Sequence, residues 1–423
     1  MNGSGGRSVA VTGLGLVSCL GRSYDEVMRA LHAGRSGVRA MPEWARLGVR
    51  SLVAGTPGDA AALRRSAAIP KELLFGMSDA ALYCALSAQD AVLDAGLTAE
   101  ALVSPRVACI VGNGSFAMAT PGYELAGMAM AGQSRRIPPY AALQYMSSSA
   151  SAAVTNLLHV LGPSYSIAAA CATSAHNIGH ACMLVRAGVV DVAIAGGGEE
   201  VDGLIAAAFE GMRNALSSGS NDKPEQACRP FCVKRDGVVL GGGGGIVVLE
   251  SLDHARARGA RVRAELVGYG ASSDGQGLYA PRPDGAQAAV CMQAAIADAG
   301  LQPDDIDYLN AHATATPAGD RAEVQAMRIV FGERLPAVSS TKAMTGHALA
   351  AAGVLEMIYC IGMLEGGFLA PSINIDRLDP AFEDLPVVRD ASDRAPTTVL
   401  SNSFGFGGTN ASLVLRRAYA STN

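Results

Sequence analysis

The sequence predicts an α/β protein whose parallel or mixed sheet is covered by helices on both faces. Three observations support this fold class. Short β-rich runs recur along all 423 residues, and several end at a glycine before a helical pattern begins. Gly is abundant, with 50 residues, whereas aromatic residues make up only 5%, which favours tight packing and sharp turns over a helical bundle. Finally, 49% of the residues are hydrophobic and 17% are charged, which excludes a disordered chain.

The expected strands are continuous apolar runs, as in a sheet that is buried on both faces. In the first part of the chain they cover Val9–Thr12, Val107–Val111 and Val192–Ala195, and each of them precedes a glycine. The later runs are Ile246–Leu249, Ala264–Val267, Tyr308–Asn310 and Thr398–Leu400.

Two segments resemble each other and indicate a duplicated fold. SYSIAAACATSAHNIGHACMLVRAG and PAVSSTKAMTGHALAAAGVLEMIYCIGMLEGG both run from a strand, through a turn of small residues, into a long helix rich in Ala and Gly. The pattern predicts two halves, 1–253 and 254–423, that meet around one site. Their boundary falls in the charged connector Leu252–Arg263. No low-complexity linker separates them, so we expect one compact body.

Charge and composition exclude several classes of protein. A net charge of −5 and a pI near 5.8 argue against a nucleic-acid binder, which would show a basic face. The N-terminal residues show no charged leader followed by an apolar run, and no uncharged apolar stretch is long enough to span a bilayer, so we expect neither a signal peptide nor a membrane segment. The nine cysteines form no CxxC or zinc-like spacing. We therefore expect a cytoplasmic protein with reduced thiols and no metal site.

Cys171 is a candidate nucleophile. It lies between an apolar strand expected over Tyr165–Ala169 and a helix expected to begin near Thr173, so its sulfur is placed at a helix N-terminus. Unpaired N–H groups and the helix dipole favour a thiolate at such a position. A buried structural cysteine is the alternative interpretation.

His312, Lys342 and His347 are the other candidates for chemistry. His312 follows the strand Tyr308–Asn310, and α/β proteins often hold working groups at the carboxyl ends of strands. Lys342 and His347 precede the helix that carries Glu356, so both can project toward one cavity. The alternatives are a hydrogen-bonded structural histidine and, for the pair, a surface lysine with a capping histidine. The surrounding Ala and Gly residues offer the pair little solvated surface.

The loop SNSFGFGGTN near the C-terminus concentrates glycine around two phenylalanines. Gly405, Gly407 and Gly408 imply unusual backbone angles or close approach of the backbone to a ligand. Such a loop can present N–H groups as an oxyanion hole, or it can be a tight structural turn. The run GGGGG at 241–245 lacks the Lys-Ser/Thr of a phosphate loop and leads into a strand, so we interpret it as a packing feature.

Together these motifs resemble the β-ketoacyl-acyl carrier protein synthases, which are condensing enzymes with the thiolase fold. The resemblance covers nearly the whole chain, from VTGLGLVS through ACATSAHNIG, AGGGEE, NDKPEQACRPF, KRDGVVLGGGGG, LNAHATATPAGD, STKAMTGHALAAAG and APSIN to SNSFGFGGTNA. Within the family, Asn221–Gly245 and APSINI look most like synthase I of bacterial fatty acid synthesis. The resemblance implies a duplicated αβαβα layered fold with two mixed sheets around buried helices.

The resemblance also implies a decarboxylative Claisen condensation and a role for each matching residue. Cys171 would take the acyl group from a carrier pantetheine thioester. His312 and His347 would bind the malonyl thioester carbonyl and stabilise the enolate. Lys342, with Glu356, would hold the network behind them. The reaction calls for no metal or redox cofactor. Phosphopantetheine arrives on the carrier protein.

Further residues would shape the substrate site. By resemblance, the N–H groups of Cys171 and Phe404 would form the oxyanion hole, and the Phe404 ring would gate the malonyl side. Gly405 would lie beside the substrate. Thr314 and Thr316 would contact the pantetheine arm.

Three departures from the family pattern bear on specificity. Ala313 and Ala315 stand where the family usually has Gly and another small residue, and we expect their methyl groups to shift the loop slightly. Phe116 stands in a turn that usually holds only small residues, so we expect it to reach the acyl pocket or the dimer interface. Glu72 and Phe75 occupy part of a usually basic carrier-docking helix, which puts the identity of the carrier in question. The basic residues near that helix or in a second candidate patch are Arg64, Arg65, Lys71, Arg135 and Arg136.

The leading hypothesis is chain elongation in fatty acid synthesis, with acyl carrier protein and malonyl carrier protein as partners. A pathway-specific ketosynthase of polyene or polyketide synthesis, with a dedicated carrier, remains the alternative. Three other classes fit the sequence less well. A degradative thiolase would need a second Cys near the C-terminus, and a non-catalytic chain-length factor would lack the nucleophile. A cysteine hydrolase would not explain Lys342 or two histidines. The family implies a homodimer through the apolar segment around Ile110–Ala131, or a heterodimer with another ketosynthase-like chain.

Overall fold

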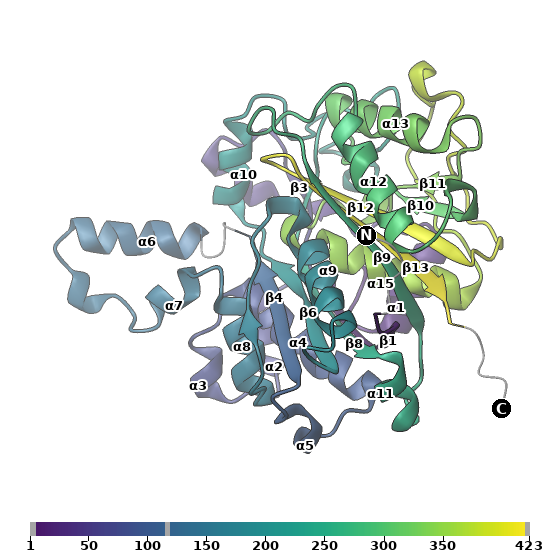
Figure 1. Cartoon of the computed structure of the whole chain (residues 1–423). Helices are drawn as coiled ribbons and strands as arrows, with labels where there is room; N and C mark the ends of the chain where they lie inside the picture. The colour runs from purple at the N-terminus through teal and green to yellow at the C-terminus, as the bar shows by residue number, and fades with distance from the viewer. Residues whose placement is uncertain (1–5, 115–118, 419–423) are drawn as a thin grey trace.

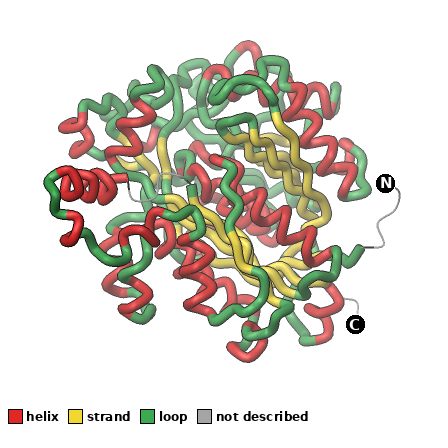
Figure 2. Tube along the Cα trace, turned by 60° about the vertical axis from the view of Figure 1, so that its left-hand side comes forward, coloured by secondary structure: helices red, strands yellow, loops and turns green. Residues whose placement is uncertain are grey.

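The structure, a computed structural model, describes residues 6–114 and 119–418. Its main feature is a mixed ten-stranded sheet with the strand order β11-β10-β12-β13-β9-β1-β8-β6-β4-β5 (Figures 1 and 2). The strands are β1 Val9–Val17, β4 Val107–Asn113, β5 Ser164–Tyr165, β6 Val192–Glu199, β8 Gly243–Ser251, β9 Ala264–Ser273, β10 Tyr308–Asn310, β11 Ala337–Ser339, β12 Thr398–Gly405 and β13 Thr409–Arg417.

The sheet consists of two five-stranded halves with the same topology. In the first half β1, β8 and β6 are antiparallel neighbours, and β6, β4 and β5 are parallel. In the second half β9, β13 and β12 are antiparallel neighbours, and β12, β10 and β11 are parallel. The halves join where β1 pairs with β9, through Ala10 with Glu265 and Val11 with Ala264. The duplicated α/β fold with a mixed sheet in each half is therefore confirmed.

The helices form three layers, a central one that contacts both halves of the sheet and an outer one on each half. The central layer holds α9 (Thr173–Arg186) and α15 (Ala352–Gly366), and each of them contacts strands of both halves. The outer helices are α4 (Asp79–Ala95) and α8 (Ser149–Leu158) on the first half and α12 (Ala286–Asp298) and α13 (Pro317–Phe331) on the second. The other helices are α1 Tyr24–His32, α2 Ala60–Ser66, α3 Lys71–Leu74, α5 Ala99–Leu102, α6 Ala119–Met130, α7 Ala141–Tyr145, α10 Gly203–Glu210, α11 Leu252–Ala257 and α14 Lys342–Thr345.

The window Leu349–Gly366, which includes α15, is long and apolar enough to cross a membrane by length and composition. The window contains two charged residues, Glu356 and Glu365, so it does not contradict the expectation that no uncharged apolar stretch is long enough to span a bilayer. In addition, 89% of the window is buried inside the protein, as expected of the core helix of a duplicated α/β fold.

Paired glycines allow the outer helices to pack directly on the sheet. A Cβ atom added at Gly13 or Gly15 of β1 would lie about 2 Å from a backbone oxygen of α4, and one at Gly268 or Gly270 of β9 would meet α12 at a similar distance. The two Gly-x-Gly pairs occupy equivalent strands of the two halves. The duplication therefore extends from topology to the residues that set helix–sheet packing.

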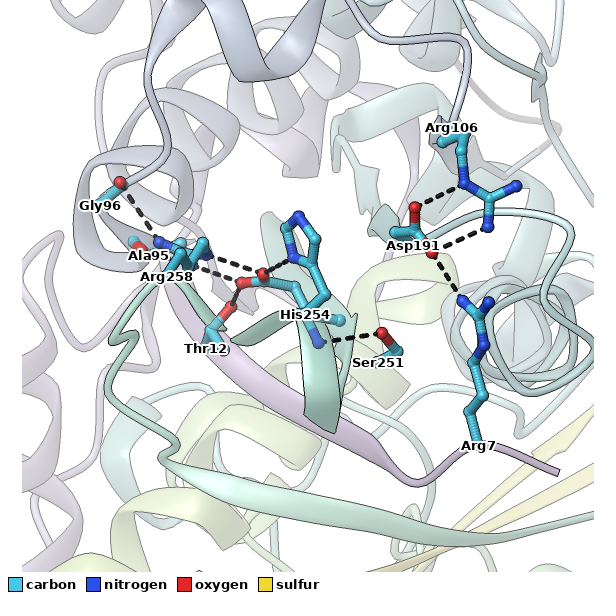
Figure 3. A network of polar contacts seen from close by, with 10 residues as sticks. Arg7, Thr12, Ala95, Gly96, Arg106, Asp191, Ser251, His254 and Arg258 are labelled. Carbon is cyan, nitrogen blue, oxygen red and sulfur yellow. Dashed lines mark hydrogen bonds and ion pairs between the residues drawn. The ribbon is translucent and has the colours of Figure 1, made fainter. Parts of the chain in front are cut away.

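A buried carboxylate stabilises the first half beneath the β1–β8 pair. Glu250 on β8 is fully buried and accepts hydrogen bonds from Thr12, His254 and Arg258 (Figure 3). Burial opposes ionisation, but the hydrogen bonds from Arg258, Thr12 and His254 outweigh it and lower the pKa of Glu250. A nearby cluster joins Asp191 to Arg7 and Arg106.

Replacing Glu250 by alanine is expected to lower the free energy of unfolding by about 3 kcal/mol, because Arg258 and Thr12 lose their buried partner. Since the folded-state pKa of Glu250 lies below its unfolded value, its stabilising effect is present above the unfolded pKa and is lost as the pH falls. Urea unfolding of the wild type and Glu250→Ala between pH 7 and about pH 3 measures both effects. Asp304→Asn, which breaks an exposed ion pair with Arg334, is the control and should leave the midpoint unchanged. A Glu250→Ala midpoint equal to that of the wild type would contradict the assignment.

Candidate active site

Segments from both halves converge on one cavity of about 340 Å³. Its lining includes Cys171, His312 and His347. The other lining residues that the sequence singled out are Thr314, Thr316, Phe404 and Gly405. Lys342 and Glu356 lie behind this lining in the core, and Phe116 lies outside the described residues.

Cys171 sits in the short 3-10 turn η3 (Ala170–Ala172), directly before the central helix α9. The turn begins with Ala170 at φ +47°, a left-handed conformation that a non-glycine residue adopts only when its surroundings hold it there. The Thr409 hydroxyl donates to the carbonyl of Ala169, 3.0 Å away, and so fixes the entry to the turn. Ala172, the N-cap residue of α9, makes no side-chain cap hydrogen bond. The nucleophile candidate is thus held on a strained backbone at the floor of the cavity.

The thiol environment differs from the expected one. Burial raises the pKa of Cys171 to about 11, while the Phe406 N–H and the positive charge of Lys342 act in the opposite direction. We expected the helix N-terminus to favour a thiolate, but the apolar surroundings of the sulfur outweigh that effect. The resting group is therefore a thiol with a donor and a cation placed to stabilise its anion.

Two phenylalanines of this loop are candidates for the oxyanion hole, and the role expected of the Phe404 N–H stays a prediction. A backbone hydrogen bond from Phe406 lowers the pKa of Cys171. Phe404 is still part of β12, where it pairs with Asn410, whereas Phe406 lies beyond the end of the strand. The Phe404 ring lies 6.0 Å from that of His312, and the Phe406 ring stacks on Phe209 at 5.9 Å between centroids. The two phenylalanines thus differ in position, one inside strand β12 and the other beyond its end, and the sequence pattern did not resolve this difference.

His312 and His347 form a pair of neutral imidazoles. Their ring centroids lie 5.1 Å apart and the planes are nearly perpendicular. Burial lowers the pKa of both side chains well below 6.5, and the charge of Lys342 lowers them further. Within the described part of the chain, Nδ1 of His312 and both ring nitrogens of His347 have no hydrogen-bond partner. Both rings line the cavity, so they can approach a ligand there.

Lys342 and Glu356 form a buried ion pair behind the two histidines. Lys342 opens α14 and is fully buried, and Glu356 lies on α15. Burial raises the pKa of the Glu356 carboxyl, and the Lys342 ammonium opposes that rise. The alternative of a surface lysine with a capping histidine is wrong, because both Lys342 and His347 are buried.

Glu323 on α13 was not singled out from the sequence. Its two carboxylate oxygens accept the N–H groups of His312, at 2.9 Å, and Ala313, at 2.7 Å, so it holds the loop that carries the histidine. Asn402 of β12 donates to the same carboxylate. The available signal was an acidic residue among the apolar positions of α13, which is unusual for a buried helix face.

The loop after His312 accommodates its alanines through a second carboxylate. Ala315 is fully buried with φ +66°, a conformation that favours glycine. Its N–H donates to Asp320, and its carbonyl accepts the N–H of Gly237, both at 3.1 Å. The hydroxyl oxygen of Thr316 accepts the Gly319 N–H at the start of α13 and lies 3.3 Å from that of Thr314. Both threonines therefore keep defined positions at the cavity wall.

Comparison with known proteins agrees with this geometry. The family description "Beta-ketoacyl synthase, N-terminal domain" matches residues 6–255, and "Beta-ketoacyl synthase, C-terminal domain" matches residues 263–376. The chain is similar to 3-oxoacyl-[acyl-carrier-protein] synthase 1 of Escherichia coli strain K12, with 46% identity over 415 residues, 97% of this chain and 99% of that protein. The protein of the same name from Haemophilus influenzae is 43% identical over 412 residues, again covering 97% of this chain and 99% of its own length.

Solved structures with the same fold include a β-ketoacyl synthase from Burkholderia phymatum STM815. It superimposes with a TM-score of 0.92 at 35% identity, covering 98% of this chain and 100% of its own. The ishigamide ketosynthase/chain length factor superimposes with a TM-score of 0.89 at 32% identity, with the same two coverages.

Proposed function

The chain belongs to the β-ketoacyl synthase family, and on that premise we propose that it condenses an acyl group carried on Cys171 with a malonyl group in fatty acid chain elongation. Both groups arrive as thioesters on acyl carrier protein. The observation that carries the proposal is that a nucleophile candidate and two neutral imidazoles with unpartnered nitrogens line the same cavity. Phosphopantetheine comes with the carrier, and the proposed steps use no metal or redox cofactor.

The first step is transfer of the acyl group to the enzyme. The Cys171 sulfur attacks the thioester carbonyl, a new C–S bond forms, and the carrier thiol leaves with the proton that Cys171 gives up. The N–H groups of Cys171 and Phe406 stabilise the oxyanion of the tetrahedral intermediate. Burial disfavours the thiolate, whereas the Phe406 N–H and the Lys342 charge lower the pKa of Cys171 and so favour the attack.

The second step joins the two chains. His312 and His347 donate hydrogen bonds to the carbonyl oxygen of the malonyl thioester, and carbon dioxide leaves as the enolate forms. The enolate carbon attacks the acyl carbonyl, and the Cys171 thiolate is the leaving group. Neutral imidazoles suit this role because they stabilise negative charge on oxygen without providing a strong acid that would protonate the enolate carbon.

Further contacts concern the carrier and a second copy of the chain. Thr314 and Thr316 are placed to contact the pantetheine arm. The segment α6–α7 projects from the body (Figure 1) and exposes large hydrophobic side chains, as does the neighbouring α3. These are Phe75, Tyr123, Met130, Tyr140, Leu143, Tyr145 and Met146. Such a surface fits a cytoplasmic homodimer, and light scattering that gives a monomeric mass would contradict it.

Intact-protein mass spectrometry after mixing the enzyme with a panel of acyl carrier proteins tests the proposed function. We expect transfer of saturated or cis-unsaturated acyl groups from a carrier of fatty acid synthesis, with a mass increase equal to the acyl group. Loading from a dedicated carrier alone, or with polyene chains alone, would instead support a pathway-specific ketosynthase. Phe75, which directly follows α3 and is 66% exposed, and the exposed Glu72 on α3 make that comparison necessary, because both alter a usually basic docking segment.

A further inference from the structure

The duplicated fold places a second turn opposite the one that carries Cys171. The turn η6 (Leu349–Ala351) precedes the central helix α15 in the way that η3 precedes α9. Both turns are three residues long, and both begin with a left-handed residue, Ala170 at φ +47° and Leu349 at φ +46°. The middle residue is Cys171 in the first turn and Ala350 in the second. Ala350 is thus the internal counterpart of the nucleophile.

The two turns pack reciprocally against strands of the opposite half. The turn η3 contacts β12 of the second half, and η6 contacts β6 of the first. Beside η3, β12 leads into the Phe406 N–H that faces the Cys171 sulfur. Beside η6, β6 ends at Glu199, whose carboxylate oxygen Oε2 accepts the Ala350 N–H at 3.4 Å. The place beside η3 is open to a substrate oxygen. The equivalent place beside η6 is filled by the carboxyl group of Glu199.

Glu199 is isolated from solvent and close to the reacting groups. It is 1% exposed, and its second oxygen, Oε1, has no hydrogen-bond partner in the described part of the chain. Burial, followed by the charge of Glu200, raises the pKa of Glu199 to about 8. Backbone N–H groups of Ala350, Glu200 and Gly114 oppose that rise. The proposed reaction assigns this carboxyl no role. A buried acid beside the active site therefore needs an explanation.

His347 depends on its backbone for its position, because its ring has no hydrogen-bond partner among the described residues. On one side, its N–H donates to the Val239 carbonyl and its carbonyl accepts the Gly241 N–H, both at 2.8 Å. On the other side, the chain continues through Ala348 into η6, which the bond from Ala350 to Glu199 holds. The loop of His312 is held in a comparable way by Glu323.

We propose that Glu199 is a positioning residue for His347: it occupies the place in the second half that a substrate oxyanion takes in the first, and it fixes the turn η6. The proposal rests on the proposed function, in which His347 serves malonyl decarboxylation and Cys171 serves acyl transfer. Loss of the bond to Ala350 should therefore affect decarboxylation far more than acyl loading.

Glu199→Met and Glu199→Gln form a matched pair of variants, since both side chains have nearly the size of glutamate but only glutamine keeps an acceptor. We expect Glu199→Met to decarboxylate malonyl carrier protein about 10²-fold more slowly than the wild type, the effect of a displacement of about 1 Å. Acyl loading should change less than about threefold, and Glu199→Gln should stay near the wild type in both assays. Glu200→Gln is the control, because Glu200 accepts the N–H groups of Asp79 and Ala80 at the start of α4.

Each outcome decides the proposal. Unchanged decarboxylation in Glu199→Met, or equal losses of decarboxylation and acyl loading, would overturn it. If thermal melting shows that Glu199→Met does not fold, Glu199→Ala replaces it. Failure of both variants to fold beside a folded, active Glu199→Gln would assign the carboxyl to the stability of the whole fold and so reject the proposal. A wild type that neither loads an acyl group nor releases carbon dioxide would refute the proposed function itself, before any variant is compared.

Discussion

Replacement of Cys171 by alanine is expected to abolish the acyl adduct and to lower the rate of condensation by about 10⁴-fold, the order of loss seen when a nucleophile is removed. Decarboxylation of malonyl carrier protein should remain within about tenfold of the wild-type rate, because both neutral histidines and the Lys342–Glu356 pair stay in place. Intact-protein mass spectrometry measures the adduct, and release of carbon dioxide measures the second activity.

Cys182→Ala provides the control for this experiment. Cys182 is fully buried on the same helix, α9, and its sulfur donates only a weak hydrogen bond to the Leu266 carbonyl. Its replacement should leave acyl loading unchanged. An acyl adduct on Cys171→Ala would place the nucleophile elsewhere, and parallel loss of both activities would indicate that the substitution disrupts the cavity rather than one chemical step.

Replacement of Lys342 by methionine is expected to lower the free energy of unfolding by about 3–5 kcal/mol, because Glu356 is left as a buried carboxylate without its partner. Decarboxylation should also fall, by about 10²-fold, since the network behind the histidines loses its charge and its hydrogen bond. The positive charge of Lys342 lowers the pKa of His312 and His347, so the pKa of both rings should rise in the variant. Urea unfolding measures the loss of stability, and the carbon dioxide assay measures the loss of decarboxylation.

The double variant Lys342→Met with Glu356→Gln separates stability from chemistry. It removes both charges, so most of the lost stability should return, because an unpaired buried charge costs more than a neutral amide. Decarboxylation should stay low. Recovery of the activity together with the stability would show that the ion pair serves the fold and has no part in the chemistry.

Much of the fold could be predicted because buried strands leave a plain signal. The seven apolar runs expected as strands, from Val9–Thr12 to Thr398–Leu400, lie inside observed strands. The strand expected over Tyr165–Ala169 was wrong, because β5 ends at Tyr165. Beyond it, Ser166 donates to the Val111 carbonyl at 2.6 Å, and the Ala169 N–H donates to the Thr173 hydroxyl at 2.8 Å. These side-chain bonds turn the backbone early, and an apolar pattern does not reveal them.

Site residues that follow the end of a strand could be predicted from the sequence. Site residues whose role depends on tertiary contacts could not. Cys171, His312 and His347 each follow a strand of the duplicated sheet, and the structure brings them together as expected. Glu199 and Glu323 could not be found in this way, because acidic residues are usually exposed and the partners of these two are backbone N–H groups. For Glu199, that N–H group also lies in the other half of the chain. The roles of all these residues in catalysis remain predictions for the variants described above.

The position of β1 has a consequence for synthesis of the chain on the ribosome. This first strand lies in the middle of the ten-stranded sheet, between β8, which begins at Gly243, and β9, which begins at Ala264. Synthesis proceeds at about 5–20 residues per second, so the unpaired edges of β1 remain without their partner strands for more than roughly 10 s. Most of the first half must leave the ribosome before β1 can pair, so the nascent chain is exposed to aggregation during that interval. Binding of a chaperone to the segment Val9–Val17 would protect it until β8 has emerged.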